Sequence, residues 1–81
     1  MEAVVPDKRI NIKGLVCPYT FVKAKLAVEA MDLGQVLEVL LDYEEAARSI
    51  PKSMEDHGQK VLKLEKINET DWILQIKKEK D

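Results

Sequence analysis

Three glycines, at positions 14, 34 and 58, divide this chain into segments whose apolar residues recur with different periods. Residues 10–13 alternate between apolar and polar side chains, which is the period of a half-buried strand. Residues 36–41 are almost all apolar, which is typical of a strand inside a sheet. After positions 17 and 43, apolar residues recur at spacings of three and four, which indicates helices. Together the periods predict strands over 10–13, 36–41, 61–67 and 72–77 and helices over 18–33 and 44–57.

The first predicted helix carries two apolar stripes. One consists of Phe21, Ala24, Val28 and Met31, and the other of Tyr19, Val22, Leu26 and Leu33. Only one stripe needs to face a sheet, so the other either packs on the second helix or meets a partner. Gly34 is expected to cap this helix at its C-terminus. In the second helix, Pro51 predicts a kink or a fresh start, because proline lacks the backbone N–H.

The order of elements, β-α-β-α-β-β, predicts an α/β fold of the two-layer α+β sandwich type. We expect a four-stranded mixed sheet with both helices packed on one face. The last two strands are separated by residues 68–71, a length that suits a hairpin. Their predicted apolar faces consist of Leu62 and Leu64 in the first strand and of Trp72, Leu74 and Ile76 in the second. The predicted organisation is an N-terminal tail over 1–7, a single domain over 8–78 and a C-terminal tail over 79–81.

Composition excludes several classes of function. The chain has 81 residues, too few for two domains, and a net charge of -2, which argues against nucleic-acid binding. A single cysteine excludes an internal disulfide, a CxxC redox pair and a cysteine-rich zinc site. No apolar run approaches the roughly 18 residues of a membrane span, and the first residues lack the pattern of a signal peptide. We therefore expect a cytoplasmic protein in a reducing compartment, with no membrane partner.

Cys17 is the residue most suited to chemistry. Composition alone leaves open that it is a small buried apolar residue. Its place directly before Pro18, however, puts it at the predicted N-cap of the first helix. Free N–H groups and the positive end of the helix dipole would favour the thiolate there, and Lys13 and Lys25 would add positive charge. A lone thiolate can carry a transferable group and pass it to a partner's thiol.

The segment Lys13-Gly14-Leu15-Val16-Cys17-Pro18 resembles the signature of the TusA/SirA family of small sulfur-carrier proteins. Lys25 stands where that family has a basic residue on its first helix. Asp42, Arg48, Ile50-Pro51 and Gly58 are similar to its second characteristic stretch, and the resemblance runs from about Arg9 to Lys77. It implies a two-layer α/β sandwich and a persulfide on Cys17. It permits tRNA thiolation, cofactor sulfuration or dissimilatory sulfur metabolism.

Three positions depart from the family pattern. Asn11 replaces an aspartate, Lys13 replaces an arginine, and Thr20 stands where a second proline is expected. Unlike proline, Thr20 offers a backbone N–H, and at the third helical position this donor could reach the Cys17 sulfur. The hypothesis is that Thr20 favours the anionic sulfur, and the alternative is that it faces solvent. Gly14, Pro18 and Thr20 are thus the predicted supports of the helix start.

The resemblance implies protein partners: a cysteine desulfurase or rhodanese-like donor and a sulfur-accepting protein. Tyr19, Val22 and Leu26 are the predicted docking surface, with Lys13, Lys25 and Arg48 as charge support. We expect no metal site, because His57 has no second soft ligand nearby. We also expect a monomer without cofactor. The alternative function is a non-catalytic interaction or regulatory module whose cysteine is incidental or senses redox state.

Overall fold

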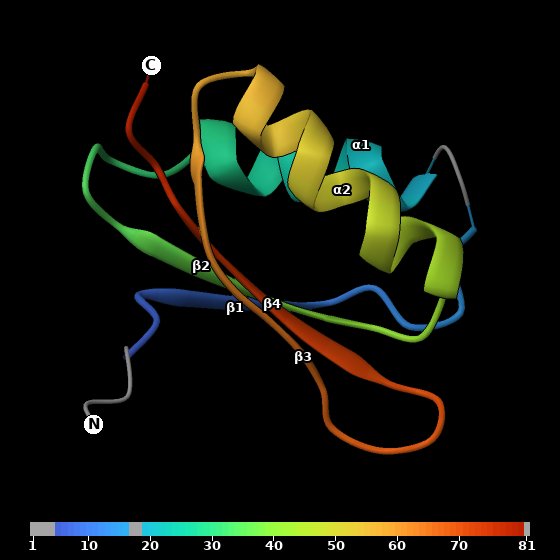
Figure 1. The fold of residues 1–81 in the computed structure, drawn as a ribbon. Coiled ribbons are helices and arrows are strands. Elements are labelled where there is room, and N and C mark those ends of the chain that lie inside the picture. Colours follow the sequence, from blue (N-terminus) through green and yellow to red (C-terminus); the bar gives the residue numbers. More distant parts are fainter. Residues whose placement is uncertain (1–4, 17–18, 81) are drawn as a thin grey trace.

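The structure is a computed structural model that describes residues 5–16 and 19–80. Its elements follow the predicted order and form two layers, with both helices over one face of a four-stranded sheet (Figure 1). This confirms the predicted fold class. The elements are β1 (Lys8–Asn11), α1 (Tyr19–Glu29), β2 (Val36–Leu41), α2 (Glu44–Asp56), β3 (Lys60–Lys66) and β4 (Trp72–Lys77).

The sheet has the strand order β1-β2-β4-β3. β1 runs parallel to β2, with Ile10 opposite Val39, whereas β4 runs antiparallel to both β2 and β3. The sheet is therefore mixed, as predicted. Its central strands, β2 and β4, match their predicted ranges. Each is a run of mostly apolar residues that polar residues bound on both sides.

The core lies between the sheet and the helices. Alternation along β2 turns Leu37, Val39 and Leu41 to the helices, and all three are fully buried. Leu74 and Ile76 of β4 lie beside them, because residues paired across antiparallel strands point to the same face. The helices add their own buried residues, among them Ala24 and Val28 of α1 and Ala46, Ala47, Ile50 and Met54 of α2.

The first strand and first helix end earlier than predicted. β1 stops at Asn11, and Ile12 follows as a buried residue whose N–H donates to the Leu40 carbonyl at 2.9 Å. α1 ends at Glu29, five residues before Gly34, so the prediction that Gly34 caps it was wrong. Gly34 instead makes the turn into β2 with a φ of 87°, a backbone conformation that glycine adopts without steric cost.

α2 continues through Pro51, so the expected fresh start there was wrong. Proline inside a helix costs about 3 kcal/mol, because one backbone hydrogen bond is lost and its ring crowds the preceding turn. Ile50 and Met54, on either side of Pro51, are 0% and 2% exposed. Full burial of such side chains contributes about 1.5–3 kcal/mol each, which offsets the cost of the proline and keeps the helix in one piece.

β3 contains a bulge at Leu62, where the register shifts between Val61 and Lys63. Because of this extra residue, Val61 and Leu64 pair with the inward-facing Ile76 and Leu74. Val61 packs against the core in place of Leu62, which corrects the prediction that Leu62 and Leu64 share the apolar face. On β4, Trp72, Leu74 and Ile76 do share it, as predicted.

Candidate functional site

The candidate site is the segment that enters α1. Cys17 and Pro18 lie outside the described residues, so their predicted roles stay predictions. The described residues on both sides show how the helix begins. The Val16 carbonyl accepts the N–H of Tyr19 at 2.8 Å and the N–H of Thr20 at 3.3 Å. Val16 therefore already supplies the first carbonyl acceptor of the helical hydrogen-bond pattern.

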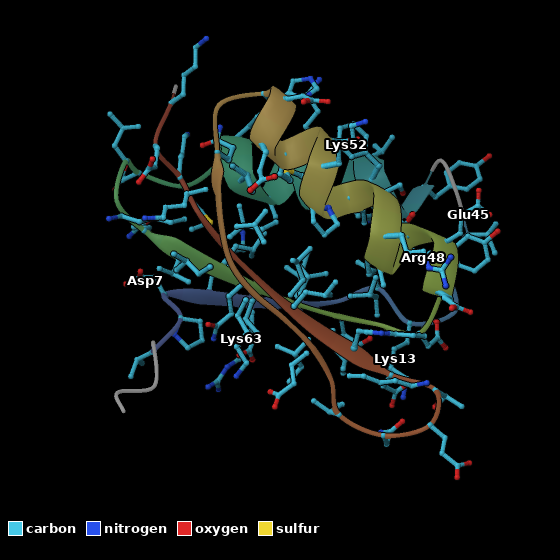
Figure 2. The ribbon with its side chains drawn as sticks, viewed as in Figure 1. Asp7, Lys13, Glu45, Arg48, Lys52 and Lys63 are labelled. Carbon is cyan, nitrogen blue, oxygen red and sulfur yellow. The ribbon has the colours of Figure 1, made fainter. Side chains whose placement is uncertain are left out.

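The turn that precedes Cys17 in sequence is tied to the sheet by two carboxylates. The Gly14 N–H donates to Asp42 Oδ1 at 3.0 Å, and Asp42 directly follows β2. Lys13, labelled in Figure 2, has its Nζ 3.1 Å from Asp71 Oδ2. Asp71 directly precedes β4. Gly14 has a φ of 89°, a conformation that other residues rarely adopt. The turn is thereby anchored to the ends of both central strands.

Asp71 is a site residue that the sequence reasoning missed. Its carboxylate accepts hydrogen bonds from Asn68 Nδ2 at 3.0 Å, from Lys13 Nζ and from Thr70 Oγ1 at 3.1 Å, and the residue is only 7% exposed. The hydrogen bond from Asn68, followed by the one from Lys13, lowers the pKa of Asp71 below its ordinary value. The signal was present in the turn sequence, because Asn68 Oδ1 also accepts the N–H groups of Thr70 and Asp71 in an Asx turn.

Thr20 is fully buried, so the alternative that it faces solvent was wrong. The inner face of α1 consists of Thr20, Ala24, Ala27 and Val28, at helical spacing, while Phe21 is only partly buried. Because the Thr20 N–H donates to the Val16 carbonyl, the Cys17 sulfur would have to share this donor. Thr20 is therefore a buried residue whose N–H belongs to the hydrogen bonds that begin α1.

The second apolar stripe of α1 is exposed. Tyr19, Val22 and Leu26 are 63%, 45% and 57% exposed, and Val16 just before the helix is 50% exposed. The stripe therefore does not pack on α2, which leaves the alternative of a partner. We call these four residues the α1 stripe. Exposed apolar residues gathered on one helix face are typical of an interaction surface.

The three cations predicted as charge support belong to different parts of the fold. Lys13 lies on the turn that precedes Cys17 in sequence and is paired with Asp71. Arg48 lies on α2, where its Nη2 is 2.7 Å from Glu44 Oε2 in an exposed pair (Figure 2). Lys25 lies on α1 and lines a hollow between the two helices. Lys13 and Arg48 thus have carboxylate partners of their own.

Residues 5–16 and 19–80 form neither a metal site nor a membrane-spanning helix. No three His, Cys, Asp or Glu side chains of these residues gather as a metal site would require. Nor is any helix formed by these residues both long enough and apolar enough to span a bilayer.

Known proteins resemble the chain over most of its length. The family described as "Sulfurtransferase TusA" matches residues 8–78. A protein of Archaeoglobus fulgidus named "Putative sulfur carrier protein" is 45% identical over 69 residues, which cover 85% of this chain and 78% of the relative. A protein of Thermotoga maritima with the same name is 34% identical over 70 residues, 86% of this chain and 89% of that protein.

The fold gives the same assignment. The crystal structure of a SirA-like protein from Desulfitobacterium hafniense superimposes with a TM-score of 0.74 at 30% sequence identity. The match covers 90% of this chain and 99% of that structure. The sequence match and the shared fold lead to one conclusion: the chain belongs to the TusA/SirA family of sulfur-carrier proteins.

Proposed function

We propose that this protein holds sulfane sulfur as a persulfide on Cys17 and relays it from a donor sulfurtransferase to an acceptor protein. The observation that carries the proposal is the family match over residues 8–78, which includes the Gly14-to-Pro18 motif around the only cysteine. A cysteine desulfurase or a rhodanese-like enzyme is the donor, and the acceptor is a protein with a reactive thiol.

The transfer needs no oxidant or reductant. The Cys17 thiolate attacks the outer sulfur of the donor's persulfide, which forms a new S–S bond to Cys17 and breaks the one in the donor. The donor leaves as a thiolate, and the proton of its persulfide stays with the transferred sulfur. An acceptor thiolate then attacks that outer sulfur in the same way, which restores the Cys17 thiolate.

The described surroundings of Cys17 support this role. Gly14, Lys13 and Thr20 hold the flanking backbone to Asp42, Asp71 and the Val16 carbonyl. A fixed approach to the helix start keeps Cys17 near the positive end of the helix dipole, which favours the thiolate. Pro18 is suited to the first helical positions because its missing N–H would have no helical acceptor there.

The α1 stripe is the proposed docking surface for both partners. Val16 and Tyr19 flank Cys17 in sequence, and Val22 and Leu26 continue the stripe along the helix. A patch formed by one helix face is smaller than a stable interface, so affinity is modest and each partner can leave after transfer. The proposal includes a monomeric carrier that acts in the cytoplasm.

Mass spectrometry tests the proposal. The protein is incubated with a cysteine desulfurase and cysteine, and the intact mass is measured without reductant. Wild type should gain the mass of one or more sulfur atoms, and Cys17→Ser should gain none. In a matched control, Cys17→Ser combined with Ser49→Cys moves the thiol to an exposed position on α2. This variant should load far more slowly, because it lacks the helix-start environment.

Alkylation separates the proposal from an interaction module with an incidental cysteine. An accessible thiolate reacts with iodoacetamide in the folded protein, and its rate rises with pH around a pKa lower than that of an ordinary cysteine. Failure of the folded protein to react, together with no sulfur gain from any donor, would refute the carrier function.

A further inference from the structure

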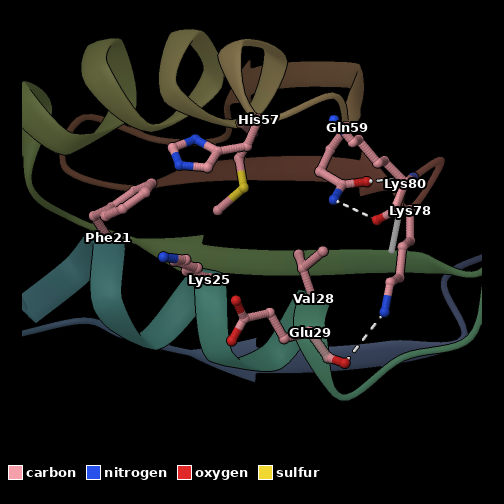
Figure 3. A pocket seen from close by; sticks show the side chains of 9 residues that line it. Phe21, Lys25, Val28, Glu29, His57, Gln59, Lys78 and Lys80 are labelled. Carbon is pink, nitrogen blue, oxygen red and sulfur yellow. Dashed lines mark hydrogen bonds between the residues drawn. The ribbon is translucent and has the colours of Figure 1, made fainter.

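A hollow of about 360 Å³ opens between the two helices and the segment that follows β4. α1 contributes Phe21, Lys25 and Glu29, the end of α2 contributes Met54 and His57, and Lys80 closes the far side. Figure 3 shows Phe21 and His57 at one end of the hollow and Lys80 at the other. Volumes of about 300 Å³ and above are large enough for a small ligand.

The floor of the hollow is apolar and includes an aromatic pair. Val28 and Met54, 3% and 2% exposed, belong to the core beneath it. The rings of Phe21 and His57 lie with their centroids 5.9 Å apart at an interplanar angle of 46°. His57 Nδ1 is 2.7 Å from the Ser53 carbonyl oxygen, so the ring donates a hydrogen bond to that carbonyl. The body of a ligand would lie against Phe21 and Met54.

The far wall is held in place by hydrogen bonds (Figure 3). Gln59 Oε1 accepts the N–H groups of Glu79 at 2.8 Å and Lys80 at 3.2 Å, and Gln59 Nε2 donates to the Lys80 carbonyl at 2.9 Å. Lys78 Nζ donates to the Glu29 carbonyl at 3.1 Å. The hollow is therefore formed before any ligand arrives, which lowers the entropic cost of binding.

The charges around the hollow favour an anion. Three lysines and one glutamate line it. Within residues 5–16 and 19–80, the ammonium groups of Lys25 and Lys80 and the carboxylate of Glu29 make no hydrogen bond or ion pair with another side chain. The Lys80 stem lies across Gly58, whose missing Cβ would come within 2.8 Å of it. Two ammonium groups are thus available to a ligand at the mouth of an apolar hollow.

We propose that this hollow binds a small amphiphilic anion, with an aromatic or short aliphatic body on the apolar floor and a carboxylate, sulfonate or phosphate group beside the Lys25 ammonium group. The proposal concerns binding of a ligand and does not rest on the sulfur-carrier function, so it goes beyond it. Phe21 belongs to the first turns of α1. An occupied hollow therefore contacts the same helix that the cysteine precedes.

Two fluorescent probes of similar shape test the proposal. One is 8-anilinonaphthalene-1-sulfonate, which is anionic, and the other is N-phenyl-1-naphthylamine, which is neutral. The anion should bind more tightly to wild type, and its advantage should shrink as salt is raised. Lys25→Ala should weaken the anion roughly threefold and leave the neutral probe unchanged. The matched control is Lys23→Ala, an exposed lysine of the same helix that does not line the hollow.

The α1 stripe is the competing place for such probes, so the test also locates them. Phe21→Ala should reduce binding of both probes, and Leu26→Ala should leave it unchanged. Amide shifts in an NMR titration should be largest at Phe21, His57 and Lys80. Equal affinity for the two probes, or a loss of binding in Leu26→Ala instead of Phe21→Ala, would overturn the proposal. Native NMR spectra of each variant show that a loss does not come from unfolding.

Discussion

Lys78 carries a charged group into the interior, and its replacement by methionine is the sharpest test of what holds α1 in place. The residue is only 4% exposed. Its Nζ donates to the carbonyl oxygens of Glu29 at 3.1 Å and Met31 at 2.6 Å, where α1 ends. α1 has no basic residue of its own in its last turn. Lys78, just beyond β4, thus provides the cation that the helix C-terminus favours.

Lys78→Met keeps a side chain of similar length but removes both donors. Hydrogen bonds from a charged donor contribute about 1.5–3 kcal/mol each, although two from one group do not add fully. The lost charge at the helix C-terminus contributes about 0.3–1 kcal/mol more. Better burial of an apolar side chain returns part of this free energy. We expect the free energy of unfolding to fall by about 2–4 kcal/mol.

Urea denaturation followed by circular dichroism measures the difference. The matched control is Lys77→Met, whose side chain is 42% exposed and lies 4.0 Å from Glu79, and its effect should stay below about 0.5 kcal/mol. A Lys78→Met protein as stable as Lys77→Met would refute the argument. It would mean that the two carbonyls are satisfied as well by water as by the ammonium group.

Three further predictions concern the turn, the stripe and a glycine. Asp71→Asn should destabilise the protein at pH 7. Because the pKa of Asp71 is lowered from 3.8, the difference from wild type in urea denaturation should disappear as the pH falls through that lower pKa, and a constant difference would contradict the ionic role. Leu26→Glu should leave stability unchanged and slow sulfur loading by a donor enzyme, whereas unchanged loading would exclude the α1 stripe as the docking surface. Gly58→Ala should cost more stability than Gly34→Ala. Both glycines have φ near +90°, a conformation that costs an alanine about 1–2 kcal/mol. Of the two, only Gly58 has a side chain, that of Lys80, where the added Cβ would lie, so equal losses of stability would contradict this contact.

The strength of the apolar pattern decided how much of the fold could be predicted. β2 and β4 were placed correctly because their apolar runs end at polar residues. The end of α1 was placed too late, because Met31 and Leu33 continue the helical spacing of apolar residues beyond Glu29, where the chain has already turned. Spacing shows which residues share a face, but it does not show that Lys78, 49 residues away in sequence, binds the carbonyl of the last residue of α1.

The candidate site was predictable only in part. The motif around Cys17 and the exposed positions of Tyr19, Val22 and Leu26 were expected from the sequence. The pairing of Lys13 with Asp71 was not, because 58 residues separate them and only the sheet brings them together. Thr20 was uncertain because a threonine fits both a buried and an exposed helix face. Its burial depends on how α1 is rotated against the sheet.

The borders of the sheet limit how this molecule can associate. β1, at one border, has only four residues, and β3, at the other, is interrupted at Leu62 and carries lysines at 60, 63 and 66. Short length, irregular pairing and positive charge all hinder a neighbouring chain from extending the sheet. Backbone-driven polymerisation into fibrils is therefore disfavoured at both borders, and contacts with other proteins are left to side chains rather than to the strand edges.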